Sequence, residues 1–73
     1  MAAKKIYQQE MSYWNKYYPN GTTERKSFAS VERAIEDAVA FVEKREEWME
    51  SYNPTSAKVI NKDTGEVEWA WEA

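Results

Sequence analysis

The sequence lacks cysteine and histidine altogether. Without thiols and imidazoles the chain can form no disulfide, and it has neither the usual ligands of a zinc site nor a cysteine–histidine nucleophile pair. A domain of 73 residues buries only about 60% of the surface that its unfolded chain exposes. We therefore expect a modest core that depends on aromatic packing or on oligomerisation for its stability.

Glycine is nearly as scarce. The chain has two glycines, Gly21 and Gly65, and both fall in turn sequences, so none is left for a glycine-rich phosphate loop. The acidic residues lack the spacing of a calcium loop, and one helix on one sheet offers little room for a substrate cleft. We therefore predict a protein that is not an enzyme and that uses no cofactor and no metal ion.

Long apolar runs are missing too. No stretch of about 18 apolar residues could cross a bilayer, and the segment after Lys5 is not the apolar core of a secretory signal. The net charge is −3, with 32% charged residues, which gives no general attraction to nucleic acid or anionic lipid. These features favour a cytoplasmic protein with no membrane partner, and they make nucleic acid an unfavourable partner.

Two turn signals divide the chain. Residues 18–22 read Tyr-Pro-Asn-Gly-Thr and residues 62–66 read Lys-Asp-Thr-Gly-Glu. Both fit a type I turn followed by a left-handed glycine, which commonly closes a β-hairpin. Each turn lies between segments of strand-like composition.

One helix is predicted between the two hairpins. Apolar residues recur at helical spacing from Val31 to Met49, Ser30 is a suitable N-cap, and Asn53-Pro54 ends the pattern. The order of elements predicts an α+β fold: ββαββ, a four-stranded, mainly antiparallel sheet with one long helix packed on one face. Residues 1–73 form a single domain, with 1–9 as a candidate flexible N-terminal arm.

Turn geometry also predicts the strand registers. In the second hairpin, pairing Lys62 with Glu66 places Val59 opposite Trp69 and Ala57 opposite Trp71 on the side that meets the helix. The other side then pairs Ile60 with Glu68 and Lys58 with Ala70. The last strand, 66–72, is either an open edge for a partner strand or an edge protected by its alternating glutamates.

In the first hairpin, pairing Tyr18 with Thr22 places Trp14 opposite Lys26 and Ser12 opposite Phe28. Either Trp14, Tyr18 and Phe28, or Met11, Tyr13 and Tyr17, would then point away from the helix. Exposed aromatic surface often marks an interaction site, although lysine and arginine stems or the N-terminal arm could equally cover these rings. The predicted partner-binding residues are Trp14, Tyr17, Tyr18, Arg25 and Lys26, and a homodimer through the same face is one form of this interaction.

A stripe of carboxylates provides an alternative site. Its members, which helical spacing places near one side of the helix, are Glu32, Glu36, Glu43, Glu47 and Glu50. Such a row could imitate a nucleic-acid backbone and act as an acidic decoy that inhibits a nucleic-acid-handling enzyme. Interspersed basic residues and the small net charge also fit an ordinary solvated helix face.

A second alternative is a single-stranded nucleic-acid binder. In it, Trp14, Tyr17 or Tyr18 would stack on bases while Lys16, Arg25 and Lys26 contact phosphates. Phosphate contacts dominate such affinity, however, and this chain carries more acidic than basic residues.

The turn and cap segments carry a family resemblance. Residues 18–25 (YPNGTTER), 28–35 (FASVERAI) and 57–67 (AKVINKDTGEV) resemble those of short uncharacterised ββαββ accessory proteins encoded by phages, prophages and bacterial genomes. The resemblance implies a small protein that modulates a host or defence protein, and it transfers no active-site residue. Together with the aromatic residues, it leads us to expect a non-enzymatic protein-interaction module that binds a protein partner.

Overall fold

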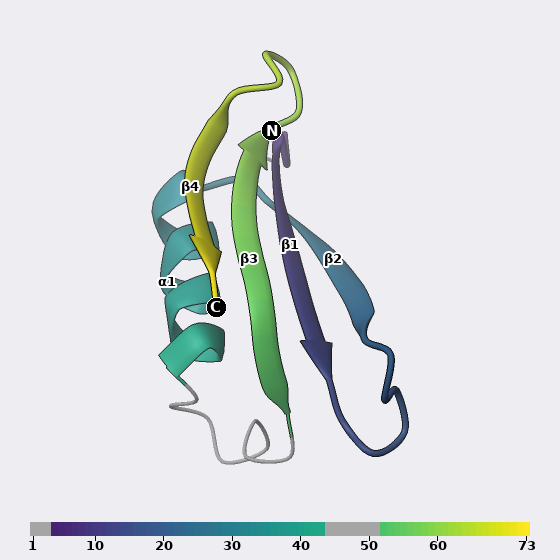
Figure 1. Cartoon of the computed structure of the whole chain (residues 1–73). Coiled ribbons are helices and arrows are strands. Elements are labelled where there is room, and N and C mark those ends of the chain that lie inside the picture. Colours follow the sequence, from purple (N-terminus) through teal and green to yellow (C-terminus); the bar gives the residue numbers. More distant parts are fainter. Residues whose placement is uncertain (1–3, 44–51) are drawn as a thin grey trace.

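The computed structural model describes residues 4–43 and 52–73. Its elements are β1 (Tyr7–Trp14), β2 (Thr22–Phe28), α1 (Val31–Glu43), β3 (Asn53–Asn61) and β4 (Val67–Glu72). The strands form one sheet in the order β2-β1-β3-β4 with every neighbouring pair antiparallel, and α1 lies across one face (Figure 1). The predicted α+β fold and its ββαββ order are confirmed.

The N-terminal segment contributes to the sheet. β1 begins at Tyr7 and is one of the two central strands, and Gln9 is completely buried. Residues 7–9 therefore belong to the folded domain and not to an N-terminal arm.

Helix α1 begins where the sequence predicts. Ser30 Oγ accepts a hydrogen bond from the Arg33 N–H at 3.3 Å, and the Ser30 carbonyl accepts one from the Ala34 N–H at 3.1 Å, which is the geometry of an N-cap. The part of the predicted helix after Glu43 lies outside the described residues. Within the described ones, no helix combines the length and apolar composition needed to cross a bilayer.

The second hairpin keeps most of its predicted register. Ala57 pairs with Trp71, Lys58 with Ala70 and Val59 with Trp69, as expected. Nearer the turn the prediction is wrong, because Ile60 pairs with Val67 and leaves Glu68 as an extra residue in β4. The turn is one residue longer than predicted, with the Asn61 N–H donating to the Glu66 carbonyl, and the bulge at Glu68 restores the register.

The first hairpin departs from the prediction by five residues. Met11 pairs with Glu24 and Gln9 with Lys26, whereas the turn-based register pairs Trp14 with Lys26. The predicted turn does form, since the Gly21 N–H donates to the Tyr18 carbonyl at 2.9 Å and Gly21 has a φ of 92°. The strands stop short of it, however, and because the shift is odd, each residue of β1 shares a face with the residues of β2 that were predicted to lie on the other face.

The core lies between α1 and this face of the sheet. One cluster joins Met11, Tyr13, Phe41 and Ala57, and a second joins Ala34, Ala38 and Val59. Trp69 packs against both clusters and links them. Ala34 and Ala38 are completely buried, so the helix presents its smallest side chains where it approaches the central strands.

A polar contact is enclosed within this core. The Gln9 side-chain Nε2 donates to the Ala34 carbonyl and to Asp37 Oδ2, both at 2.9 Å, and Asp37 Oδ2 lies 3.8 Å from Lys26 Nζ. Gln9 Oε1 is buried with no hydrogen-bond partner among the described residues. The amide ties β1 to α1 at a defined position, because a displaced strand would bury it without these two acceptors.

Tyr13 provides a test of this packing. Its ring stacks on Tyr52 with centroids 4.3 Å apart, and its hydroxyl donates to Glu24 Oε1 at 3.0 Å. Burial, together with the hydrogen bond and negative charge of Glu24, raises the pKa of Tyr13 to about 12 from an ordinary value of 10.0.

We expect an ultraviolet titration of the folded protein to show one phenol ionising near pH 12, and the Tyr13→Phe variant to lack that step. Because the folded-state pKa is raised, the Tyr13 contribution to stability is complete below pH 10 and declines as the pH rises towards 12. The stability advantage of wild type over Tyr13→Phe should shrink across the same window. A Tyr13→Phe variant that retained the late step would place the buried phenol elsewhere.

Candidate functional site

The loop between β1 and β2 is organised by one buried side chain. Asn15 is 6% exposed, and its Oδ1 accepts hydrogen bonds from the backbone N–H groups of Tyr17 and Tyr18, both at 2.9 Å. The backbones of Asn15 and Tyr18 also bond to each other in both directions, at 3.2 and 3.3 Å. The chain therefore doubles back across Lys16 and Tyr17 before it reaches the predicted glycine turn, which shortens β1.

This loop and the end of β1 hold three aromatic side chains in solvent. The exposed fractions are 46% for Trp14, 74% for Tyr17 and 51% for Tyr18, and Lys16 Nζ lies 5.1 Å from the centre of the Tyr17 ring. We call Trp14, Tyr17 and Tyr18 the aromatic loop surface. Large exposed rings on a backbone fixed by hydrogen bonds are suited to binding, because little conformational freedom remains to be lost.

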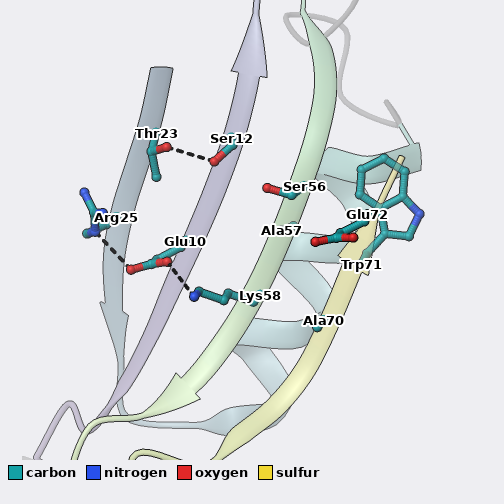
Figure 2. Close-up of a pocket in the computed structure, with 10 residues that line it drawn as sticks. All are labelled: Glu10, Ser12, Thr23, Arg25, Ser56, Ala57, Lys58, Ala70, Trp71 and Glu72. Carbon is teal, nitrogen blue, oxygen red and sulfur yellow. Dashed lines mark hydrogen bonds and ion pairs between the residues drawn. The ribbon is translucent and has the colours of Figure 1, made fainter. Parts of the chain in front are cut away.

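The sheet face opposite α1, which we call the open face, is polar over its middle. Two cross-strand rows define it: Arg25, Glu10, Lys58 and Ala70 form one, and Thr23, Ser12, Ser56 and Glu72 form the other. They line a shallow hollow of about 310 Å³ that spans all four strands (Figure 2). Its short side chains include a hydrogen-bonded pair, Ser12 Oγ and Thr23 Oγ1, 2.8 Å apart.

Glu10 is the electrostatic centre of the open face. Its Oε1 lies 3.1 Å from Arg25 Nε and its Oε2 lies 3.4 Å from Lys58 Nζ, so one carboxylate joins β2, β1 and β3 (Figure 2). Partial burial opposes ionisation of this carboxylate, but the hydrogen bonds and charges of Arg25 and Lys58 outweigh it and lower the pKa of Glu10.

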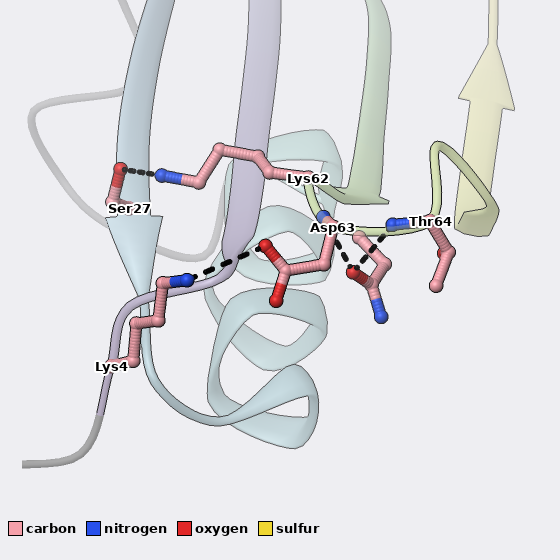
Figure 3. Close-up of polar contacts among 6 residues, drawn as sticks. Lys4, Ser27, Lys62, Asp63 and Thr64 are labelled. Carbon is pink, nitrogen blue, oxygen red and sulfur yellow. Dashed lines mark hydrogen bonds and ion pairs between the residues drawn. The ribbon is translucent and has the colours of Figure 1, made fainter.

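Polar contacts also cross the end of the sheet near the β3–β4 turn (Figure 3). Lys62 Nζ donates to Ser27 Oγ at 3.1 Å, and Lys4 Nζ lies 3.7 Å from Asp63 Oδ1. The β3–β4 turn has the same hydrogen-bond pattern as the first loop, because Asn61 Oδ1 accepts hydrogen bonds from the N–H groups of Asp63 and Thr64. Each hairpin thus starts its turn with an asparagine followed by a lysine.

The predicted aromatic sheet face does not form. Phe28, Met11 and Tyr13 pack on the helix side, and strand alternation leaves Trp14, at the end of β1, as the aromatic residue of that strand on the open face. Tyr17 and Tyr18 belong to the loop. The predicted grouping is wrong because the loop takes up residues 15–18, and the resulting odd shift places Met11 and Tyr13 on the same face as Phe28.

The two predicted basic residues are separated by the sheet. Arg25 lies on the open face, where it pairs with Glu10. Lys26 lies on the helix side, where its ammonium approaches Asp37. The structure therefore brings Arg25, but not Lys26, to the same side of the sheet as Trp14.

The structure describes three of the five glutamates of the predicted acidic stripe. Glu32, Glu36 and Glu43 are all exposed on α1, and their spacing keeps them near one side of the helix. Glu47 and Glu50 lie outside the described residues. Asn15 and Glu10, which organise the loop and the open face, are not among the predicted residues, and the repeated Asn-Lys start of both turns is the sequence signal for Asn15.

No protein-family model, curated protein or solved structure matches this chain.

We expect Asn15→Ala to lower the free energy of unfolding by about 1–3 kcal/mol, because two backbone donors lose a buried acceptor. Amide exchange at Tyr17 and Tyr18 should also accelerate. Asn15→Asp keeps the oxygen acceptor and should preserve the protection of these amides. Asn20→Ala, in the exposed part of the same loop, is the control. Equal effects at positions 15 and 20 would show that Asn15 does not hold the loop.

We expect Glu10→Gln to cost about 1 kcal/mol at neutral pH, a small value because Arg25 and Lys58 are screened by solvent. The lowered pKa means that this contribution is complete above the ordinary pKa of 4.5 and is lost as the pH falls through the folded-state value. Urea unfolding of both proteins between neutral and acidic pH measures it, with Glu72→Gln as the control. A difference that persisted unchanged into strong acid would contradict the ion-pair account.

Proposed function

We propose that this chain is a small protein-interaction module that binds a protein partner through the aromatic loop surface. The observation that carries the proposal is the exposure of Trp14 at the end of β1 and of Tyr17 and Tyr18 on the loop that buried Asn15 holds in place. Tryptophan and tyrosine are the residue types most enriched at the energetic centres of protein interfaces.

Preorganisation supports this assignment. An aromatic side chain has two rotatable bonds, so it brings large contact area at a small entropic cost. The hydrogen bonds to the Asn15 side chain fix the backbone that carries Tyr17 and Tyr18, and Trp14 is part of strand β1. A partner would therefore meet Tyr17 and Tyr18 on a backbone that is already fixed, with Trp14 and the hydroxyl row of the open face at the adjoining end of β1.

The resemblance to phage and bacterial accessory proteins guides the choice of partner. It points to a host or defence protein of a bacterial cell as the molecule to be modulated. In this proposal the chain performs no chemistry of its own, and it acts by occupying a surface of its partner.

The proposal is tested by quantitative affinity capture from bacterial lysate. Wild type, the double variant Trp14→Ser/Tyr17→Ser and the control Val67→Ser serve as baits, since Val67 is 59% exposed on β4, away from the loop. A partner of the aromatic loop surface should be retained by wild type and by the control. For the double variant, affinity measured with the purified partner should fall at least about 30-fold, as expected for hot-spot residues.

Capture that is unchanged by the double variant would overturn the aromatic loop surface as the site. A third bait, Glu32→Lys/Glu36→Lys/Glu43→Lys, then identifies the alternative. If that variant alone loses the partner, the acidic side of α1 is the binding surface and the chain is better described as an acidic decoy.

A further inference from the structure

The two edge strands of the sheet, β4 and β2, differ in the regularity of their backbones. β4 carries the bulge at Glu68, and a bulge is a common protection of an exposed edge. β2, at the other edge (Figure 1), pairs with β1 over seven residues without a register shift. Its outer backbone groups therefore form a regular row that is suitable for an added strand.

The charges of β2 are self-complementary. Its sequence is Thr-Thr-Glu-Arg-Lys-Ser-Phe, centred on Arg25. When two copies of β2 are antiparallel about Arg25, Glu24 of each copy lies opposite Lys26 of the other, and Thr23 lies opposite Ser27. Opposite charges that face each other across a strand pair are stabilising, and like charges are destabilising.

Within each monomer, the side chains of Glu24 and Lys26 stay accessible at the β2 edge of the sheet. Glu24 is exposed, and its Oε1 accepts a hydrogen bond from the Tyr13 hydroxyl at 3.0 Å. The Lys26 side chain is 50% exposed and its Nζ lies 3.8 Å from Asp37 Oδ2. Both side chains lie on the helix side of β2, where each would meet the opposite charge of a second copy.

Arg25 is the one position at which two copies would place like charges opposite each other. Each Arg25 is already paired with Glu10 of its own chain at 3.1 Å. This intramolecular ion pair with Glu10 reduces the repulsion between the two Arg25 side chains at the symmetry axis. The sequence of β2 alone would overestimate that repulsion.

We propose that β2 is the self-association edge of this protein and that it pairs antiparallel with β2 of a second copy about Arg25, which joins two four-stranded sheets into one. Edge pairing buries little side-chain surface, so the dimer belongs among the small, concentration-dependent interfaces. This inference uses a surface other than the aromatic loop surface and does not depend on the proposed function.

Sedimentation equilibrium from micromolar to millimolar concentration is the test. We expect wild type to approach twice the monomer mass at high concentration. Glu24→Lys and Lys26→Glu, each of which creates two like-charge pairs, should each weaken association by about tenfold or more. The double variant Glu24→Lys/Lys26→Glu restores the complementary pattern and should associate as wild type does.

Mixing the two single variants gives a second readout that does not require the double variant to fold. Each alone should remain mainly monomeric, whereas their equimolar mixture should form a heterodimer, because both pairs between positions 24 and 26 are then of opposite charge. Glu68→Lys on β4 is the matched control and should leave association unchanged, and circular dichroism verifies that each variant is folded. A wild type that stays monomeric throughout, or a dimer insensitive to both single variants, would overturn the proposal.

Discussion

The face that β1 turns towards the helix is the constraint on which the rest of this structure depends. With Met11 and Tyr13 inside, the strand supplies one half of the main core cluster, and Gln9 reaches the Ala34 carbonyl and Asp37. The same alternation places Glu10 between Arg25 and Lys58 on the open face. A strand has only two faces, so a shift by one residue would exchange these sets and bury Glu10 in place of Met11.

Much of the fold follows from local sequence patterns. The Ser30 cap, the helical spacing after it and the glycine turns predict ββαββ, and the pairing of Val59 with Trp69 follows from the second turn. The first register could not be obtained in this way, because the turn at Gly21 forms but does not close the strands. The hydrogen bonds of the Asn15 side chain reverse the chain direction once more before the Gly21 turn. The buried asparagine therefore decides where β1 ends, although proline and glycine give the stronger turn signal in the sequence.

The sequence predicts the exposure of the aromatic residues better than their location. Trp14, Tyr17 and Tyr18 are exposed, but on a loop and a strand end, because a sheet face follows from register and the register was wrong. Ion pairs such as Arg25 with Glu10 join residues fifteen positions apart, and only the tertiary pairing brings them together. Helix spacing, which is local, correctly placed Glu32, Glu36 and Glu43 on exposed positions of α1.

The register of the first hairpin in solution tests this account most directly. Proton–proton Overhauser contacts between strands can be measured on uniformly labelled protein, since facing residues of an antiparallel pair lie about 4.5–5.5 Å apart at their Cα atoms. The account predicts contacts between Met11 and Glu24 and between Gln9 and Lys26. Contacts between Trp14 and Lys26 and between Ser12 and Phe28 would contradict it, since they would place Met11 and Phe28 on opposite faces of the hairpin.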